Sequence, residues 1–161
     1  MTMKPLCVLA ALIATPVLAN DLQGDAANGA AQFARQCVSC HVIKNDDGET
    51  LVGRNAKAGP NLFAIAGAQL GAVPGYRYGK SIVEAGELGA IWTEANFVGY
   101  VQDPTNWLRD KLSSKRARGK MSFRVRKDTD AYDIYAYLAT FTDADTLQQA
   151  LDGAAAAEIN N

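Results

Sequence analysis

Several residue types are scarce in this chain of 161 residues. It contains one histidine, three cysteines and three methionines, and it shows no internal repeat and no glycine-rich phosphate loop. A nucleophile triad built on histidine would have only His41 to use. Sixteen basic and seventeen acidic residues leave a net charge of −1, which gives little support to nucleic-acid binding.

Long apolar runs are also missing, with one exception at the amino terminus. Lys4 is followed by an apolar stretch over residues 5–18, the small residue Ala19 and the polar Asn20. This layout is typical of a cleaved secretory signal, and the stretch is too short to span a bilayer as a permanent helix. The alternative, a buried amino-terminal helix, needs a polar face that this stretch lacks. We therefore predict export to the periplasm, removal of residues 1–19, and no permanent membrane anchor.

The remaining chain of roughly 140 residues has the size of one domain. Loss of Lys4 takes the basic residues from 16 to 15, against 17 acidic ones. Valine, isoleucine and leucine are sparse, so we expect something other than side chains to fill part of the interior. We assign residues 20–142 to this domain and residues 143–161 to an acidic, alanine-rich tail, which forms either a loose helix or a disordered end.

The cysteines of the mature chain lie close together. Cys7 leaves with the signal, so Cys37 and Cys40 remain, and His41 follows directly. Residues 37–41 read C-V-S-C-H, the C-x-x-C-H pattern of covalent c-type haem attachment. A thioredoxin-like redox pair, a zinc half-site and a plain disulfide remain as alternatives. A zinc site would need carboxylates to complete its four ligands, and no convincing strand precedes Cys37, as a redox pair would require.

The spacing of this motif suits haem attachment at the end of a helix. Residues 25–36 are rich in alanine, and Asp25 is placed to cap the start of a helix. Positions i, i+3 and i+4 share one helix face, so Cys37, Cys40 and His41 would point the same way. Two thiols would face the haem vinyl groups, and the imidazole would face the iron.

Met121, the one methionine of the mature chain, decides the sixth iron position. It lies in the run 118–123, where Gly119 indicates a loop. Gap filling is the usual role of a methionine, but with a haem present we predict that Met121 is the second axial ligand. A His/Met pair raises the reduction potential and fills both axial sites, which favours an electron carrier over an enzyme. The alternatives are a haem enzyme or ligand sensor with an open sixth site, and a haem-free thiol oxidoreductase.

The rest of the chain reads as short helices and loops. The signals predict a turn at 59–62, a short helix at 78–87, a helix from Thr93 or Glu94 to Asp103 that Pro104 ends, and a last helix capped by Asp128 or Thr129. The last helix carries an amphipathic stripe of helical period made of Ala131, Ile134, Tyr135, Leu138 and Phe141. Such a stripe packs in the core, here against the first helix or the haem.

Taken in order, these features resemble the class I cytochromes c, and within them the bacterial cytochrome c2 and c-550 type. The resemblance covers about residues 25–141. It rests on Gly29, Phe33, the C-V-S-C-H run, Gly59-Pro60-Asn61-Leu62, Tyr78, Ile91-Trp92, Tyr100, Lys120-Met121-Ser122-Phe123 and Tyr137-Leu138. It implies an all-α class I cytochrome c fold, with about four or five short helices wrapped around one haem c per chain, attached through Cys37 and Cys40.

The resemblance also implies roles for individual residues. The Pro60 carbonyl would accept a hydrogen bond from His41 and so orient the ring. Four aromatic residues would line the haem: Tyr78 and Trp92 at a buried propionate, Tyr100 near the Met121 sulfur, and Phe123 over the haem edge. The ordinary alternative for these aromatic residues is core packing with a satisfied polar tip.

The chain departs from the resemblance near the propionates. Ala68 stands where an arginine is common, and Ile82 stands where a polar residue is common. The stretch 44–57 is also longer than in mitochondrial relatives. The first two departures leave the propionate partners and the reduction potential open.

Basic residues cluster around Met121. Nine of the 15 basic residues of the mature chain lie between Arg109 and Lys127, with Asp110 as the only acid in that span. A solvated loop is the ordinary explanation, but we predict a basic rim that steers docking onto acidic faces of redox partners. The basic rim consists of Lys111, Lys115, Arg116, Arg118, Lys120, Arg124, Arg126 and Lys127.

The predicted function is that of a soluble, monomeric one-electron shuttle between membrane redox complexes. The resemblance implies a quinol-oxidising complex as donor, and a photosynthetic reaction centre or terminal oxidase as acceptor. Encounters with such partners are small and short-lived, as a shuttle requires.

Overall fold

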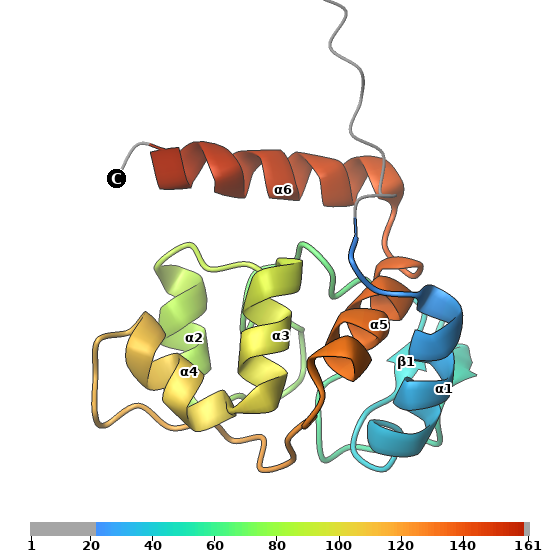
Figure 1. The fold of residues 1–161 in the computed structure, drawn as a ribbon. Coiled ribbons are helices and arrows are strands. Elements are labelled where there is room, and N and C mark those ends of the chain that lie inside the picture. Colours follow the sequence, from blue (N-terminus) through green and yellow to red (C-terminus); the bar gives the residue numbers. More distant parts are fainter. Residues whose placement is uncertain (1–21, 160–161) are drawn as a thin grey trace, which may run out of the picture.

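The computed structural model describes residues 22–159, so the predicted signal at 1–19 lies outside the described residues. The described chain is mostly helical, as predicted (Figure 1). None of its helices has the length and apolarity needed to cross a membrane. Its elements are α1 Ala26–Gln36, β1 Ile43–Lys44, β2 Thr50–Val52, α2 Lys80–Glu87, α3 Glu94–Gln102, α4 Pro104–Lys111, α5 Asp128–Ala139 and α6 Ala144–Ile159.

Helices α1 and α5, far apart in the sequence, cross at close range. The Asp25 carboxylate caps α1 by accepting the Asn28 backbone N–H at 2.8 Å, as predicted. At Gly29 a Cβ atom would collide with the Asp133 carbonyl of α5, so only glycine permits this approach. The Phe33 and Tyr137 rings lie 5.7 Å apart across the crossing. This crossing ties the helix that leads into the C-x-x-C-H motif to the core.

Helix α3 begins and ends close to its predicted limits. The Thr93 hydroxyl accepts the Asn96 backbone N–H at 3.2 Å. Pro104 ends α3 but also begins α4, which the sequence analysis did not predict. A proline fits the first turn of a helix because its missing N–H would have no partner there, and the Asp103 carboxylate caps α4 by accepting the Asn106 N–H at 3.2 Å.

Helix α5 forms where the amphipathic stripe predicted it, but its predicted cap is wrong. Lys127 occupies the cap position and makes no side-chain cap bond. Asp128 lies within the helix, and its carboxylate accepts a hydrogen bond of 2.7 Å from the Gln102 side chain instead. The stripe is buried from Ala131 to Leu138, as predicted, whereas Phe141 lies beyond the helix end and is half-buried.

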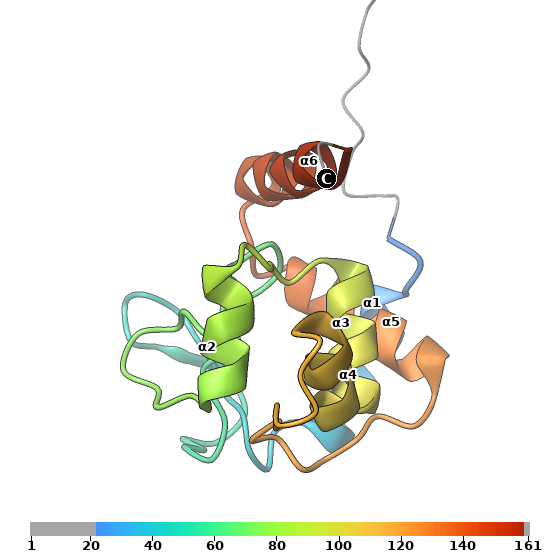
Figure 2. The same cartoon turned by 90° about the vertical axis from the view of Figure 1, so that its left-hand side faces the viewer.

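The described residues contain six helices, against the four or five expected, and a small sheet. The extra helices are α4 and α6. The segment 44–57 contributes β2, which pairs antiparallel with β1, and Gly48 with φ 86° turns the chain between them. Figures 1 and 2 show α6 lying apart from the other helices. Its Leu147 is buried, and a Cβ at Gly67 would meet the Leu147 side chain at 3.0 Å. The tail therefore forms a helix, with Leu147 in the core and Leu151 packed against the core.

Candidate cofactor site

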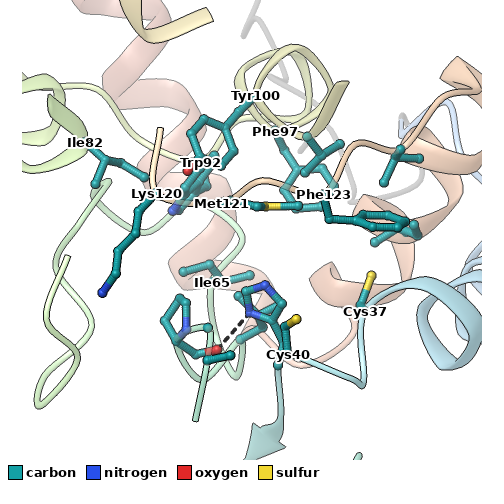
Figure 3. Close-up of a pocket in the computed structure, with 18 of the residues that line it drawn as sticks. Cys37, Cys40, Ile65, Ile82, Trp92, Phe97, Tyr100, Lys120, Met121 and Phe123 are labelled. Carbon is teal, nitrogen blue, oxygen red and sulfur yellow. Dashed lines mark hydrogen bonds between the residues drawn. The ribbon is translucent and has the colours of Figure 1, made fainter. Parts of the chain in front are cut away.

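The structure brings all nine predicted site residues to one pocket. Its walls come from the motif after α1, the turn at 59–62, α2, α3, α5 and the loop at 118–123 (Figure 3). The nine are Cys37, Cys40, His41, Pro60, Tyr78, Trp92, Tyr100, Met121 and Phe123. Much of the remaining lining is apolar, so the pocket suits a largely apolar group.

Both cysteines lie at the pocket in a tight turn after α1. The Cys40 and His41 backbone N–H groups both donate to the Cys37 carbonyl, at 3.1 and 2.9 Å. Both thiols are free. Burial, with a smaller contribution from the neighbouring Cys40, raises the pKa of the Cys37 thiol to about 12. Since a catalytic thiol needs a lowered pKa, this environment does not suit Cys37 as a catalytic thiol. No cluster of His, Cys, Asp and Glu side chains within residues 22–159 could hold a metal ion.

The His41 ring is held in one orientation. Its Nδ1 lies 3.0 Å from the Pro60 carbonyl oxygen. Since a carbonyl only accepts, Nδ1 carries the proton and Nε2 keeps a free lone pair. Burial lowers the pKa of His41, with the Pro60 bond opposing this shift, so the ring is neutral. Behind it, a Cβ at Gly59 would collide with the ring. The turn at Gly59 and Pro60 therefore both admits and orients the imidazole.

Met121 lies across the pocket from Cys40 (Figure 3). The Tyr100 and Trp92 rings pack edge to face beside it, with centroids 5.1 Å apart. Burial is the main cause that raises the pKa values of Tyr78 and Tyr100, each to about 12, so both phenols are neutral. This wall offers one soft sulfur ligand and neutral hydroxyl groups, with no carboxylate.

Trp92 carries a buried polar atom that lacks a partner. Its backbone is fully bonded: its N–H donates to Ala68 at 2.8 Å, and its carbonyl accepts from Gly67 at 2.9 Å and from the Tyr135 hydroxyl at 2.7 Å. The indole Nε1, by contrast, is buried with no hydrogen-bond partner. A buried donor left unpaired costs about 1–3 kcal/mol, so we expect an acceptor inside the pocket. A porphyrin carboxylate is such an acceptor.

The structure places Ala68 and Ile82, the two departures from the resemblance, in different positions relative to the pocket. Ile82 lines the pocket, as an apolar wall, and Ala68 does not line it. Among the described lining residues Lys120 carries the only full charge, and its Nζ donates to the Arg77 carbonyl at 2.6 Å.

Sequence reasoning missed some pocket residues. Tyr76 and Ile65 were not predicted, although both line the pocket. Tyr76 stands two residues before Tyr78, and their ring centroids lie 4.7 Å apart. These two tyrosines at alternate positions were the sequence signal that could have revealed Tyr76 as a pocket residue. Ile65 sits in the short apolar piece after the turn and gave no comparable signal.

The donor set fits a covalently bound haem. It comprises two free thiols, a neutral oriented imidazole, a methionine sulfur and an unpaired indole N–H, within largely apolar walls. The helical fold and this site together define a c-type cytochrome of class I.

Comparison with known proteins gives the particular family. The chain is 53% identical to cytochrome c2 of Rhodovulum adriaticum over 120 residues, which are 74% of this chain and 94% of that protein. It is 46% identical to cytochrome c2 of Cereibacter sphaeroides over 136 residues, 84% of this chain and 92% of that protein. The crystal structure of cytochrome c2 from Rhodobacter sphaeroides matches with a TM-score of 0.71 and 44% identity, covering 73% of this chain and 96% of that one. No family model matches the chain.

The chain belongs to the cytochrome c2 family of class I cytochromes c. Its cofactor is haem c, attached covalently through Cys37 and Cys40, and it is an electron carrier rather than an enzyme. The predictions of fold, cofactor and carrier class are thereby confirmed. The two enzyme alternatives, a haem enzyme and a haem-free thiol oxidoreductase, are wrong.

Proposed function

We propose that this protein is a periplasmic one-electron shuttle whose iron is held between His41 and Met121. The observation that carries the proposal is that both side chains line the same pocket from different segments. When bound, the haem supplies one-electron chemistry at iron. With an imidazole and a thioether in the two axial positions, no iron site is left for a substrate.

On this proposal the chain's own residues hold and shield the cofactor. Cys37 and Cys40 anchor it, and the Pro60 carbonyl keeps the His41 Nε2 lone pair aimed into the pocket. Rigid placement of both ligands keeps the surroundings of the iron nearly unchanged between oxidation states.

The polar edge of the cofactor needs donors, and the pocket offers them. We propose that the Trp92 indole N–H and the Tyr78 hydroxyl bond one buried propionate. The support is that Trp92 Nε1 is buried without a partner and that both residues line the pocket. We propose that the Tyr100 hydroxyl lies near the Met121 sulfur. Phe123, which is 44% exposed, would cover the haem edge.

Docking is assigned to the basic rim. All eight of its members are exposed, and they lie on α4 or on the loop that carries Met121. Two of them also have structural roles, since Lys120 donates to the Arg77 carbonyl and Arg124 pairs with Asp103 at 3.1 Å. The rim would attract acidic faces of partners at long range and release them as salt screens the charges.

The pattern of residues 1–20 and the family resemblance support a proposal for the setting of this function. We propose cleavage after Ala19, export to the periplasm, and action as a monomer on membrane redox complexes. A quinol-oxidising complex would donate electrons, and a photosynthetic reaction centre or terminal oxidase would accept them. We assign residues 20–142 to the carrier domain and 143–161 to an appended tail.

The test is electron transfer with purified partners at several salt concentrations. The mature holoprotein should titrate as a single one-electron couple, should accept electrons from a quinol-oxidising complex, and should do so more slowly as salt rises. A rate that does not depend on salt would refute docking through the basic rim. Failure to accept electrons from the complex would refute the shuttle.

A further inference from the structure

The loop that carries Met121 has no regular secondary structure of its own, yet three of its consecutive residues are tied to other segments. Residues 118–127 form neither helix nor strand. The three ties are Arg118 N–H to the Ser81 hydroxyl at 3.1 Å, Gly119 N–H to the Thr105 hydroxyl at 3.1 Å, and Lys120 Nζ to the Arg77 carbonyl at 2.6 Å. The loop is therefore attached to α2, to α4 and to the 73–79 loop.

Close packing accompanies the tie to α4. A Cβ at Gly119 would lie 2.7 Å from Pro104 Cβ and 3.0 Å from the Pro104 carbonyl carbon, so the loop backbone rests directly on the start of the helix. Thr105 is the next residue of that helix and supplies the hydroxyl. This seat is possible because Gly119 has no side chain.

Ser81 and Thr105 stand outside the pocket, since neither lines it. Their hydroxyls accept backbone N–H groups from the two residues that come three and two positions before Met121. A motion that lifts the loop backbone away from the pocket together with Met121 breaks one or both of these bonds. The hydroxyls thus act on the sulfur through the loop.

We propose that Ser81 and Thr105 are positioning residues that hold Met121 at the pocket, where it would bind the iron, and set how often the loop opens. The inference rests on the proposed ligation by Met121. Loss of one neutral hydrogen bond should raise the open population roughly 2- to 10-fold. Because the two bonds hold neighbouring residues of one loop, their joint loss should exceed either single loss.

The test compares hydroxyl-deleting variants of the ferric holoprotein. Thr105→Ala and Ser81→Ala should each bind added imidazole about 2- to 10-fold faster than the parent protein, with the double variant faster still. Thr105→Ser, which keeps the hydroxyl, should bind at the parental rate. Imidazole is a suitable probe because it must displace the sixth ligand to bind.

Thr93→Ala is the matched control. It removes another threonine hydroxyl that accepts a backbone N–H, at 3.2 Å, at the end of α3 opposite to α4. It should lower the free energy of unfolding without changing the rate of imidazole binding. If Thr105→Ala and Ser81→Ala behave like Thr93→Ala, the inference is overturned.

Hydrogen exchange supplies a measurement that needs no variant. In the parent holoprotein the Arg118 and Gly119 amides should exchange more slowly than the amide of the exposed neighbour Ser122. Equal exchange would overturn the inference. The failure of the proposed ligation is recognised separately, because the parent protein would then lack the weak red ferric band of a sulfur–iron bond.

Discussion

The two walls of the pocket are built in different ways. The wall around His41 consists of two short segments. The motif follows α1 directly and its turn is closed by its own backbone bonds, while the His41 ring packs against Gly59 and Pro60 in a turn 19 residues away. The wall around Met121 is an irregular loop held by side chains from distant segments. The first wall is fixed mainly by bonds within the motif and to the 59–62 turn, and the second by bonds to α2 and α4. Any adjustment of the iron site should therefore come from the Met121 wall.

The largest expected effect on stability comes from replacing a glycine by alanine in the His41 wall. The same change in the Met121 wall serves as the comparison. Gly59→Ala would drive a Cβ into the His41 ring, and overpacking at a site without slack should cost about 3 kcal/mol or more of unfolding free energy. Gly119→Ala would place a Cβ 2.7 Å from Pro104. The loop can yield there by loosening its bonds to α2 and α4, so the change should cost about 1 kcal/mol. Urea unfolding of both holoproteins measures the difference. Equal costs would remove the distinction between the walls.

A pH effect should follow from the buried phenols beside Met121. The pKa of Tyr100 in the folded protein is about 12, against an ordinary value of about 10. The contribution of Tyr100 to the free energy of unfolding is therefore fully present below pH 10. Above pH 10 the unfolded chain loses the proton first, and stability should fall by up to about 1.4 kcal/mol per pH unit until pH 12. Tyr100→Phe should flatten this decline in urea unfolding. An unchanged slope would show that Tyr100 does not cause it.

The bond between Tyr135 of α5 and Trp92 is buried in the core and belongs to neither wall. Tyr135→Phe removes a buried hydroxyl that donates to the Trp92 carbonyl at 2.7 Å. That carbonyl still accepts from Gly67, so the loss should be about 1 kcal/mol, with no change in the spectrum of the haem. Thermal unfolding and the absorption spectrum together check this. A spectral change would mean that this bond also positions the iron ligands.

The smallest effect on stability is expected at the rim of the Met121 wall. Arg126→Glu alters an exposed charge and should leave unfolding unchanged while slowing electron transfer to partners, most strongly at low salt. Arg124→Gln breaks the pair with Asp103 and should cost at most about 1 kcal/mol. Stopped-flow rates over a range of salt concentrations check the comparison. Equal rates for Arg126→Glu and the parent would remove this residue from the docking surface.

The two walls also differ in how far the sequence alone predicted them. The cysteines and His41 follow from residues 37–41 and the Asp25 cap, because these parts lie close together in one stretch of sequence. The Pro60 contact, 19 residues from His41, was implied only by the resemblance. Met121 was predicted by scarcity, as the one methionine left in the mature chain. The ties at Ser81 and Thr105 carry no local signal, since they join segments about 37 and 14 residues from the loop.

Misplaced elements have physical reasons as well. Helix α4 was missed because Pro104 was taken only as a stop, although a proline can also begin a helix. The cap of α5 was wrong because Gln102, from α3, bonds the Asp128 carboxylate, a tertiary contact that overrides the local preference. The sequence of the tail left two possibilities open, a loose helix or a disordered end. The structure shows a helix, α6, and its Leu147 is buried.

The central claim, that His41 and Met121 enclose the iron, is tested most directly by the absorption spectrum of the ferric protein. Haem that survives acidic acetone extraction, together with a weak red band that disappears in Met121→Ala, is the predicted result. Covalent haem without that band in the parent protein would contradict the claim and leave the sixth position to another ligand.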